Sequence, residues 1–145
     1  MADTRANAAA TRGQGSVHRP LSPHLSIFRP YVNMTMSILH RITGAANYFG
    51  SILLAAWLVS AAMGDQQFDA VSSFLGSPIG LIILFGYTWS VMHHMLGGVR
   101  HFIWDFGYGF EIPAIRALSW GTLLGSLTLT AVIWVSAVSH WGAWR

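Results

Sequence analysis

The chain has 145 residues, of which 53% are hydrophobic and 9% are charged, and its mean hydropathy is +0.48. Since a soluble domain carries about 25% charged residues, this composition excludes an ordinary soluble protein and indicates a membrane protein. The chain contains no cysteine, which excludes disulfides, thiolate metal sites and an iron-sulfur cluster held by this chain.

The N-terminal part is polar and rich in proline. Residues 1–18 lack the apolar core of a secretory signal peptide, and we expect a flexible tail. Their arginine, alanine and serine content also suits a mitochondrial transit peptide, but no strong amphipathic pattern supports that alternative. Residues 19–33 contain three prolines, which forbid a continuous helix. We expect an extended segment there that lies against another surface at the membrane interface.

Residues 34–145 hold three stretches that are long enough to cross a bilayer. The segments free of Asp, Glu, Lys and Arg are residues 42–64, 79–99 and 117–144. Each reaches the roughly 20 residues that a helix needs to span the membrane, and none shows the alternation of a barrel strand. The sequence therefore predicts an all-α membrane protein with three transmembrane helices and an extended, cytoplasm-facing N-terminal segment. The expected spans are about residues 37–63, 79–102 and 117–140.

The basic residues indicate orientation. All eight are arginine, and the net charge is +3. Four precede the first span and Arg41 lies at its mouth, whereas the loop at residues 65–78 carries none. By the positive-inside rule, the N-terminus and the loop between the second and third spans face the cytoplasm or matrix. Arginines beside apolar spans more often report orientation than nucleic-acid binding, so we expect no nucleic-acid partner.

The first span carries a polar or small stripe at helical spacing, formed by Ser37, Arg41, Gly44 and Tyr48. Arg41 has two interpretations, which the spacing leaves open. It could extend to lipid headgroups, or it could converge with the Ser37 hydroxyl, one turn earlier, on a ligand carbonyl or carboxylate.

The second span contains His94 and His101, which are seven residues apart and so share one helix face, roughly 10 Å apart along the axis. Gly97 and Gly98 remove side chains beside His94 and leave room for a flat ligand, such as a macrocycle ligated by one histidine. The alternative is that the histidine only packs, but an ionisable residue inside a span is a functional candidate by default. His93 lies about 100° away and cannot share that site.

Three further features flank these spans. Asp105, beyond the second span, is either a proton donor near an interfacial site or an ordinary loop acid. Gly121 and Gly125 form a small-xxx-small pair, which predicts close helix packing without chemistry. His140 lies in an aromatic belt at the outer interface, so we do not expect it to be a ligand.

The histidines and arginines of the first two spans are expected to lie at different depths in the membrane. If Arg41 and Arg100 mark the inner interface, His94 lies roughly 9 Å deeper, and His40 and His101 lie near interface level. This arrangement suits a haem whose iron is within the bilayer and whose propionates point inward. Since no other deep histidine has a suitable orientation, a six-coordinate haem would need a second ligand from a partner subunit.

Three blocks carry a resemblance to a known family. They are Arg19-Pro-Leu-Ser-Pro-His-Leu25, Ser37-Ile-Leu-His-Arg-Ile-Thr-Gly44, and His94-x-x-x-Gly-x-Arg-His101 followed by Asp105. In this order they resemble the motifs of the cytochrome b large anchor subunit of succinate dehydrogenase, respiratory complex II. The resemblance covers roughly residues 19–108; beyond residue 116 the match is in hydropathy alone.

The resemblance implies a subunit that is not catalytic alone. It would pair with a small membrane-anchor subunit and dock an iron-sulfur subunit and a flavoprotein subunit, passing electrons to ubiquinone. Ser37 and Arg41 would belong to the quinone site, and His94 would be the axial haem b ligand, with the second ligand from the small anchor. His40 and His101 would line the haem propionates, and Asp105 would have a supporting role.

Two alternatives remain at this point: a haem-free quinone-binding anchor and a purely structural membrane anchor. Because the sequence begins with Met1 and shows no clear transit peptide, we expect a bacterial inner membrane rather than a mitochondrial one. The N-terminus would be cytoplasmic.

Overall fold

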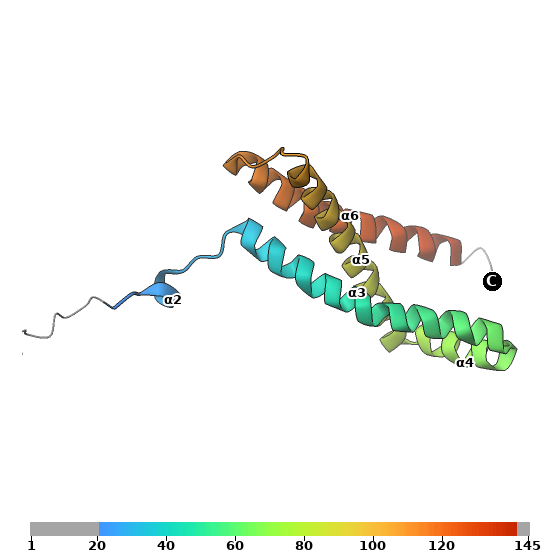
Figure 1. Ribbon diagram of the computed structural model, residues 1–145. Helices are drawn as coiled ribbons and strands as arrows, with labels where there is room; N and C mark the ends of the chain where they lie inside the picture. The colour runs from blue at the N-terminus through green and yellow to red at the C-terminus, as the bar shows by residue number, and fades with distance from the viewer. Residues whose placement is uncertain (1–20, 142–145) are drawn as a thin grey trace, which may run out of the picture.

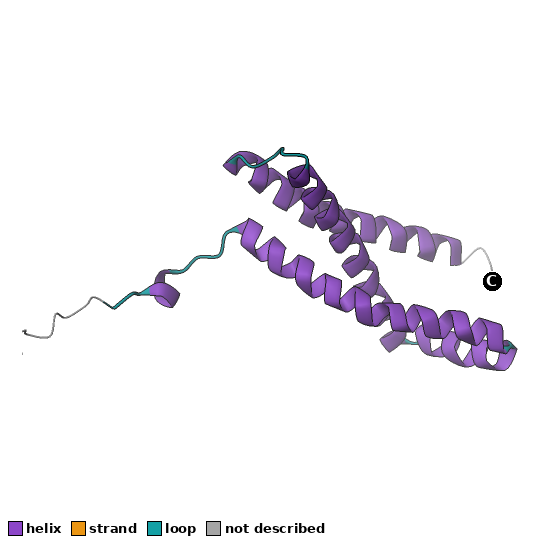
Figure 2. Ribbon diagram, viewed as in Figure 1, coloured by secondary structure: helices purple, strands orange, loops and turns teal. Residues whose placement is uncertain are grey.

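The structure is a computed structural model that describes residues 21–141, and within that range it is helical with no strand (Figure 2). The helices are α2 (His24–Ile27), α3 (Val32–Met63), α4 (Asp65–Leu75), α5 (Pro78–Asp105) and α6 (Ile112–Trp141). Helices α3, α5 and α6 are long and apolar enough to cross a membrane. The predicted all-α fold with three spans is confirmed. The expectations for residues 1–20 and 142–145 lie outside the described residues.

Helix α5 is the centre of the bundle. It packs against α6 on one side and α3 on the other (Figure 1). Helices α3 and α6 each pack more extensively against α5 than against each other. Helix α4 runs back along the C-terminal half of α3 and also contacts α5. Helix α2 is a single turn on the chain that leads into α3. Any side chain on α5 therefore faces α3, α6 or the outside of the bundle, according to its angular position.

The long helices begin where local chemistry favours helix initiation. Tyr31, next to Pro30, has extended dihedrals (φ −72°, ψ 153°) and precedes the first residue of α3. This start lies five residues before the expected residue 37. Helix α5 begins with Pro78, a favoured first position, after the Ser77 hydroxyl accepts a hydrogen bond from the Gly80 N–H at 3.2 Å. It continues to Asp105, three residues beyond the expected end, so Asp105 is helical rather than part of a loop.

Helix α4 lies where we expected only a loop. Its apolar residues Phe68, Val71 and Leu75 follow helical spacing and therefore share one face. Phe68 packs near Trp57 of α3, with ring centroids 5.9 Å apart. Gly64, whose φ of 117° suits glycine, makes the sharp turn from α3 into α4.

Small and polar side chains dominate the buried positions. Within residues 21–141, Met36 is the single buried apolar side chain, whereas nine buried side chains are polar or charged. They are Thr43, Ser60, Ser90, His93, Arg100, Ser119, Thr122, Ser126 and Thr130. Small polar residues let helix backbones approach closely in a membrane, and the large apolar side chains are left on the outer surface for lipid and neighbouring subunits.

Candidate functional site

Three histidines meet between α3 and α5. The rings of His40 and His94 stack with centroids 4.0 Å apart and an interplanar angle of 3°. His101 lies beside His40, with ring centroids 5.1 Å apart. The structure thus brings together the three histidines that the sequence assigned to one site, although His40 and His94 are 54 positions apart in the chain.

The protonation of the His94 ring follows from its neighbour. Its Nδ1 lies 3.0 Å from the backbone carbonyl oxygen of His40. Because a carbonyl can only accept, Nδ1 carries the hydrogen and donates it. In the neutral ring, Nε2 then has a free lone pair, and it makes no hydrogen bond to any residue of the described range. A hydrogen bond of this kind commonly fixes a metal-ligating histidine in orientation and tautomer.

Three glycines around the histidines play different parts. A Cβ on Gly97 would collide with the His40 ring, and a Cβ on Gly44 would lie 2.9 Å from His94 Cε1. Glycine at these two positions is what allows the two imidazoles to lie between α3 and α5. Gly98, in contrast, has nothing within 4 Å of its Cβ position. Of the two glycines expected to leave room beside His94, Gly97 is covered by the His40 ring and Gly98 has open space around it.

This geometry fits one-histidine ligation of a flat group better than a bare metal ion. The stacked His40 and His94 rings do not converge on a common point, and no cluster of three or more potential ligands occurs within residues 21–141. The Nε2 atom of His94, which makes no hydrogen bond to a described residue, could serve a macrocycle whose second ligand lies outside this chain. The residues present thus fit a haem ligated by His94.

His93 faces the opposite way. It is fully buried at 0% exposure, and its Nδ1 lies 3.2 Å from the Ser126 hydroxyl of α6. The expectation that His93 cannot share the site of His94 agrees with this position.

Ser37 and Arg41 lie one turn apart near the start of α3. Ser37 is partly buried and Arg41 is exposed. Most helical hydroxyls here bond to their own backbone: Thr35 reaches the Tyr31 carbonyl, and Thr43 reaches the Leu39 carbonyl at 2.8 Å. The Ser37 hydroxyl makes no hydrogen bond to any described residue, so it is free to serve a ligand.

Asp105 and Arg100 lie near the C-terminal end of α5. Asp105 is exposed, and nothing in its surroundings separates a supporting role from that of an ordinary acid. Arg100, which we treated only as an interface marker, is 2% exposed and lies over the Trp104 ring at 5.1 Å. Its seven-residue spacing from the buried His93 was the sequence signal for this burial. Its Nε and Nη1 atoms have no hydrogen-bond partner within residues 21–141.

Only one glycine of the small-xxx-small pair of α6 packs against α5. A Cβ on Gly125 would lie 2.9 Å from Leu96 Cδ1 of α5, whereas Gly121 has nothing within 4 Å. Close packing against α5 therefore uses Gly125 alone, and Gly121 lies on a surface that this chain leaves open.

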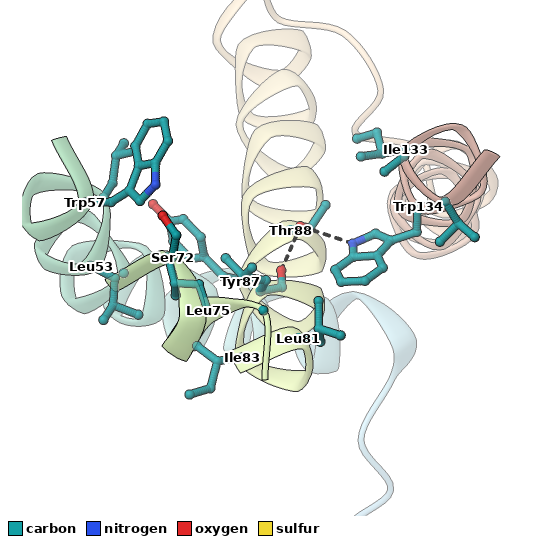
Figure 3. A pocket seen from close by; sticks show the side chains of 16 residues that line it. Leu53, Trp57, Ser72, Leu75, Leu81, Ile83, Tyr87, Thr88, Ile133 and Trp134 are labelled. Atoms are coloured by element: carbon teal, nitrogen blue, oxygen red, sulfur yellow. Dashed lines mark hydrogen bonds between the residues drawn. The ribbon is translucent and has the colours of Figure 1, made fainter. Parts of the chain in front are cut away.

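An apolar cavity of about 600 Å³ lies at the far end of the bundle, between α3, α4, α5 and α6. Figure 3 shows Leu53 and Trp57 on one side of it and Trp134 on the other, where the Trp134 indole donates to the Thr88 hydroxyl at 3.3 Å. Sequence reasoning gave no sign of this cavity, because four separate segments line it. It contains none of the histidines.

The fold and the histidine site define a class of protein: a multi-pass helical membrane protein whose central helix presents one histidine with a free ring nitrogen. Comparison with known proteins gives the family. The model of the succinate dehydrogenase/fumarate reductase transmembrane subunit family matches residues 16–133, and the chain belongs to this family.

Curated relatives agree with this assignment. The chain is 37% identical over 117 residues to the succinate dehydrogenase cytochrome b556 subunit of Rickettsia prowazekii, which covers 81% of this chain and 91% of the relative. It is 38% identical over 115 residues to the cytochrome b556 subunit of Paracoccus denitrificans, covering 79% and 88%. It is 36% identical over 124 residues to the mitochondrial cytochrome b560 subunit of Sus scrofa, covering 83% and 72%. The predicted family is confirmed, and with it a membrane-anchor role in complex II.

Proposed function

We propose that this chain anchors a succinate:quinone oxidoreductase in the membrane, supplies part of its ubiquinone-reduction site and provides one axial ligand of haem b. Electrons would arrive from the iron-sulfur clusters of a partner subunit and leave on ubiquinone. The observation that carries the proposal is the fixed orientation of His94, whose Nδ1 donates to the His40 carbonyl at 3.0 Å and whose Nε2 is left free.

The haem part is supported by the surroundings of His94. Gly98, one turn from His94 on α5, has open space around it, His40 stacks on the His94 ring, and His101 lies beside His40. Imidazole N–H groups there could donate to propionates. Bound haem would supply a one-electron redox centre within the membrane. The curated relatives carry cytochrome b in their names, which is consistent with this role.

The quinone part is supported by Ser37 and Arg41. The uncommitted Ser37 hydroxyl can donate to a quinone oxygen, and the Arg41 guanidinium, one turn further along α3, can stabilise the negative charge that develops on reduction. Asp105 is proposed only as a supporting acid. None of these residues performs succinate oxidation, which belongs to the flavoprotein subunit.

The proposal requires partners. A small membrane-anchor subunit would supply the second haem ligand, because His93, the other deep histidine, is directed toward α6. An iron-sulfur subunit and a flavoprotein subunit would dock at the inner face, beside the start of α3. The location we propose is a bacterial inner membrane with the N-terminus in the cytoplasm.

The quinone assignment is tested with Ser37→Ala and Arg41→Leu in the assembled complex. We expect both to lower the ubiquinone reductase rate, by about 10-fold or more for Arg41→Leu because a charged donor is lost at the reacting oxygen. Succinate oxidation with an artificial acceptor should be retained. Thr35→Ala and Arg116→Leu are the matched controls, since they remove a hydroxyl bonded to its own helix and an exposed arginine of α6. Quinone kinetics that match the controls would contradict the assignment and leave a structural anchor.

Orientation has a separate test. A reporter fused after Arg145 should give a periplasmic signal, because three spans place the C-terminus opposite the N-terminus. A cytoplasmic signal would reverse the proposed topology.

A further inference from the structure

The buried contact between His93 and α6 has no part in the function proposed above. His93 is 0% exposed and so is Ser126, its partner on α6. An imidazole inside a membrane span is costly unless it forms hydrogen bonds. Because His93 directly precedes His94 in the chain, a contact that fixes His93 can also affect the position of His94.

The direction of the His93 hydrogen bond follows from the hydroxyl. The Ser126 hydroxyl has one hydrogen, which it donates to the Leu123 carbonyl at 2.8 Å. Its oxygen must therefore accept from His93 Nδ1–H, 3.2 Å away. A short relay thus runs from α5 through Ser126 to the backbone of α6.

Side-chain hydrogen bonds between the long helices are few. In the part of the chain that the structure describes, α5 and α6 share the His93–Ser126 bond and the bond from Trp134 to Thr88. On the α3 side, the Ser90 hydroxyl lies 3.0 Å from the Thr43 carbonyl, and His94 donates to the His40 carbonyl. The Trp134 contact lies at Thr88, five residues or about one and a half turns from His93 along α5. At the level of the site, the two adjacent histidines therefore connect α5 to opposite neighbours.

We infer that His93 and Ser126 form a positioning pair that sets the rotation of α5 and thereby the orientation of the His94 ring. Consecutive residues on a helix differ by about 100°, so a bond that holds His93 against α6 directs His94 toward α3, where its Nδ1 donates to the His40 carbonyl. His93 acts through the backbone it shares with His94 and touches no ligand itself. This inference rests on the proposed haem ligation by His94.

The test uses Ser126→Ala and His93→Leu in the assembled complex. Ser119→Ala is the matched control, because Ser119 is equally buried on the same helix and its hydroxyl bonds only to the Ile115 carbonyl of its own helix, at 2.8 Å. His93→Asn is the rescue variant, since an asparagine amide can place a donor near the position of Nδ1.

The first readout is the electron paramagnetic resonance spectrum of the oxidised haem, which reports axial ligand orientation. We expect shifted low-spin g values in Ser126→Ala and His93→Leu with haem still bound, and wild-type values in Ser119→Ala. His93→Asn should return most of the shift. Unshifted spectra in both positioning variants, or an equal shift in Ser119→Ala, would overturn the inference.

A second readout does not depend on haem. The chain has no cysteine, so Leu96→Cys with Gly125→Cys introduces its only pair, at positions that pack together between α5 and α6. We expect Ser126→Ala to lower the yield of this disulfide, and Ser119→Ala to leave it unchanged. An unchanged yield in Ser126→Ala would count against the inference. Absence of haem from the wild type would instead contradict the proposed function, so the two failures are distinguishable.

Discussion

The two sides of α5 differ in what they do with the same residue type. On the α3 side, His94 donates from Nδ1 to the His40 carbonyl and keeps Nε2 free of any hydrogen bond to a described residue. On the α6 side, His93 is enclosed completely and is bound to a serine. The first arrangement is suited to ligation and the second to packing. The difference shows that neighbours, rather than residue identity, decide which intramembrane histidine is a ligand candidate.

Substitution of the glycines on α5 and α6 tests this difference between the two sides of α5, because each glycine either admits a neighbouring side chain or leaves a surface open.

Gly97→Val should have the largest effect on stability. Its Cβ would collide with the His40 ring, which lies between two helices and has little room to move. Overpacking of this kind costs about 3 kcal/mol, so the assembled complex should lose the most thermal stability of the variants in this series. Loss of activity on heating in detergent measures it. A stable Gly97→Val complex with intact haem would show that α3 and α5 are not closely packed at this level.

Gly98→Leu should spare the fold of this chain and still remove haem. No atom lies within 4 Å of the Gly98 Cβ position, so the added side chain fills only the surface proposed for the macrocycle. We expect the complex to assemble with its haem-to-protein ratio strongly reduced, as measured by pyridine haemochrome absorbance. Full haem content in Gly98→Leu would place the haem elsewhere.

Gly125→Val tests the packing of α6 against α5. Its Cβ would lie 2.9 Å from Leu96 Cδ1, the end of a flexible side chain that can shift. We expect a loss of about 1 kcal/mol in unfolding free energy, and almost none for Gly121→Val, which has open space. Denaturant titration of the detergent-solubilised complex compares the two. Equal losses would mean that a partner subunit also covers Gly121.

Ser90→Ala should have a smaller effect than Gly125→Val. It removes a hydroxyl that lies 2.8 Å from Asn47 Oδ1 and 3.0 Å from the Thr43 carbonyl. Interhelical hydrogen bonds in membranes contribute about 0.6 kcal/mol on average, so the same titration should show a shift close to that size. A loss as large as that of Gly97→Val would mean that Ser90 has a further role.

The sequence predicted the three spans because a bilayer imposes length and apolarity on each helix separately. It also predicted that His94 and His101 share a face and that His93 does not, since helical geometry fixes those angles. It missed α4, whose short amphipathic pattern competes with its loop-like composition. It also missed the contacts from Gly97 to His40 and from His93 to Ser126, because these depend on which helix lies against which face of α5.

Arg100 illustrates the same limit. Its place near the inner end of the second span suggested an arginine that reaches the interface. The structure instead places it among buried residues beside Trp104. Arg100 follows His93 by seven residues and so shares its helix face, but the sequence does not indicate that this face is covered.

The most direct test of the account is the dithionite-reduced minus oxidised absorbance spectrum of the purified complex, compared between wild type, His94→Ala and His93→Asn. We predict a low-spin b-type signal in wild type, its loss in His94→Ala and its retention in His93→Asn. A signal that survives in His94→Ala would contradict the central claim that the α3-facing side of α5 supplies the haem ligand.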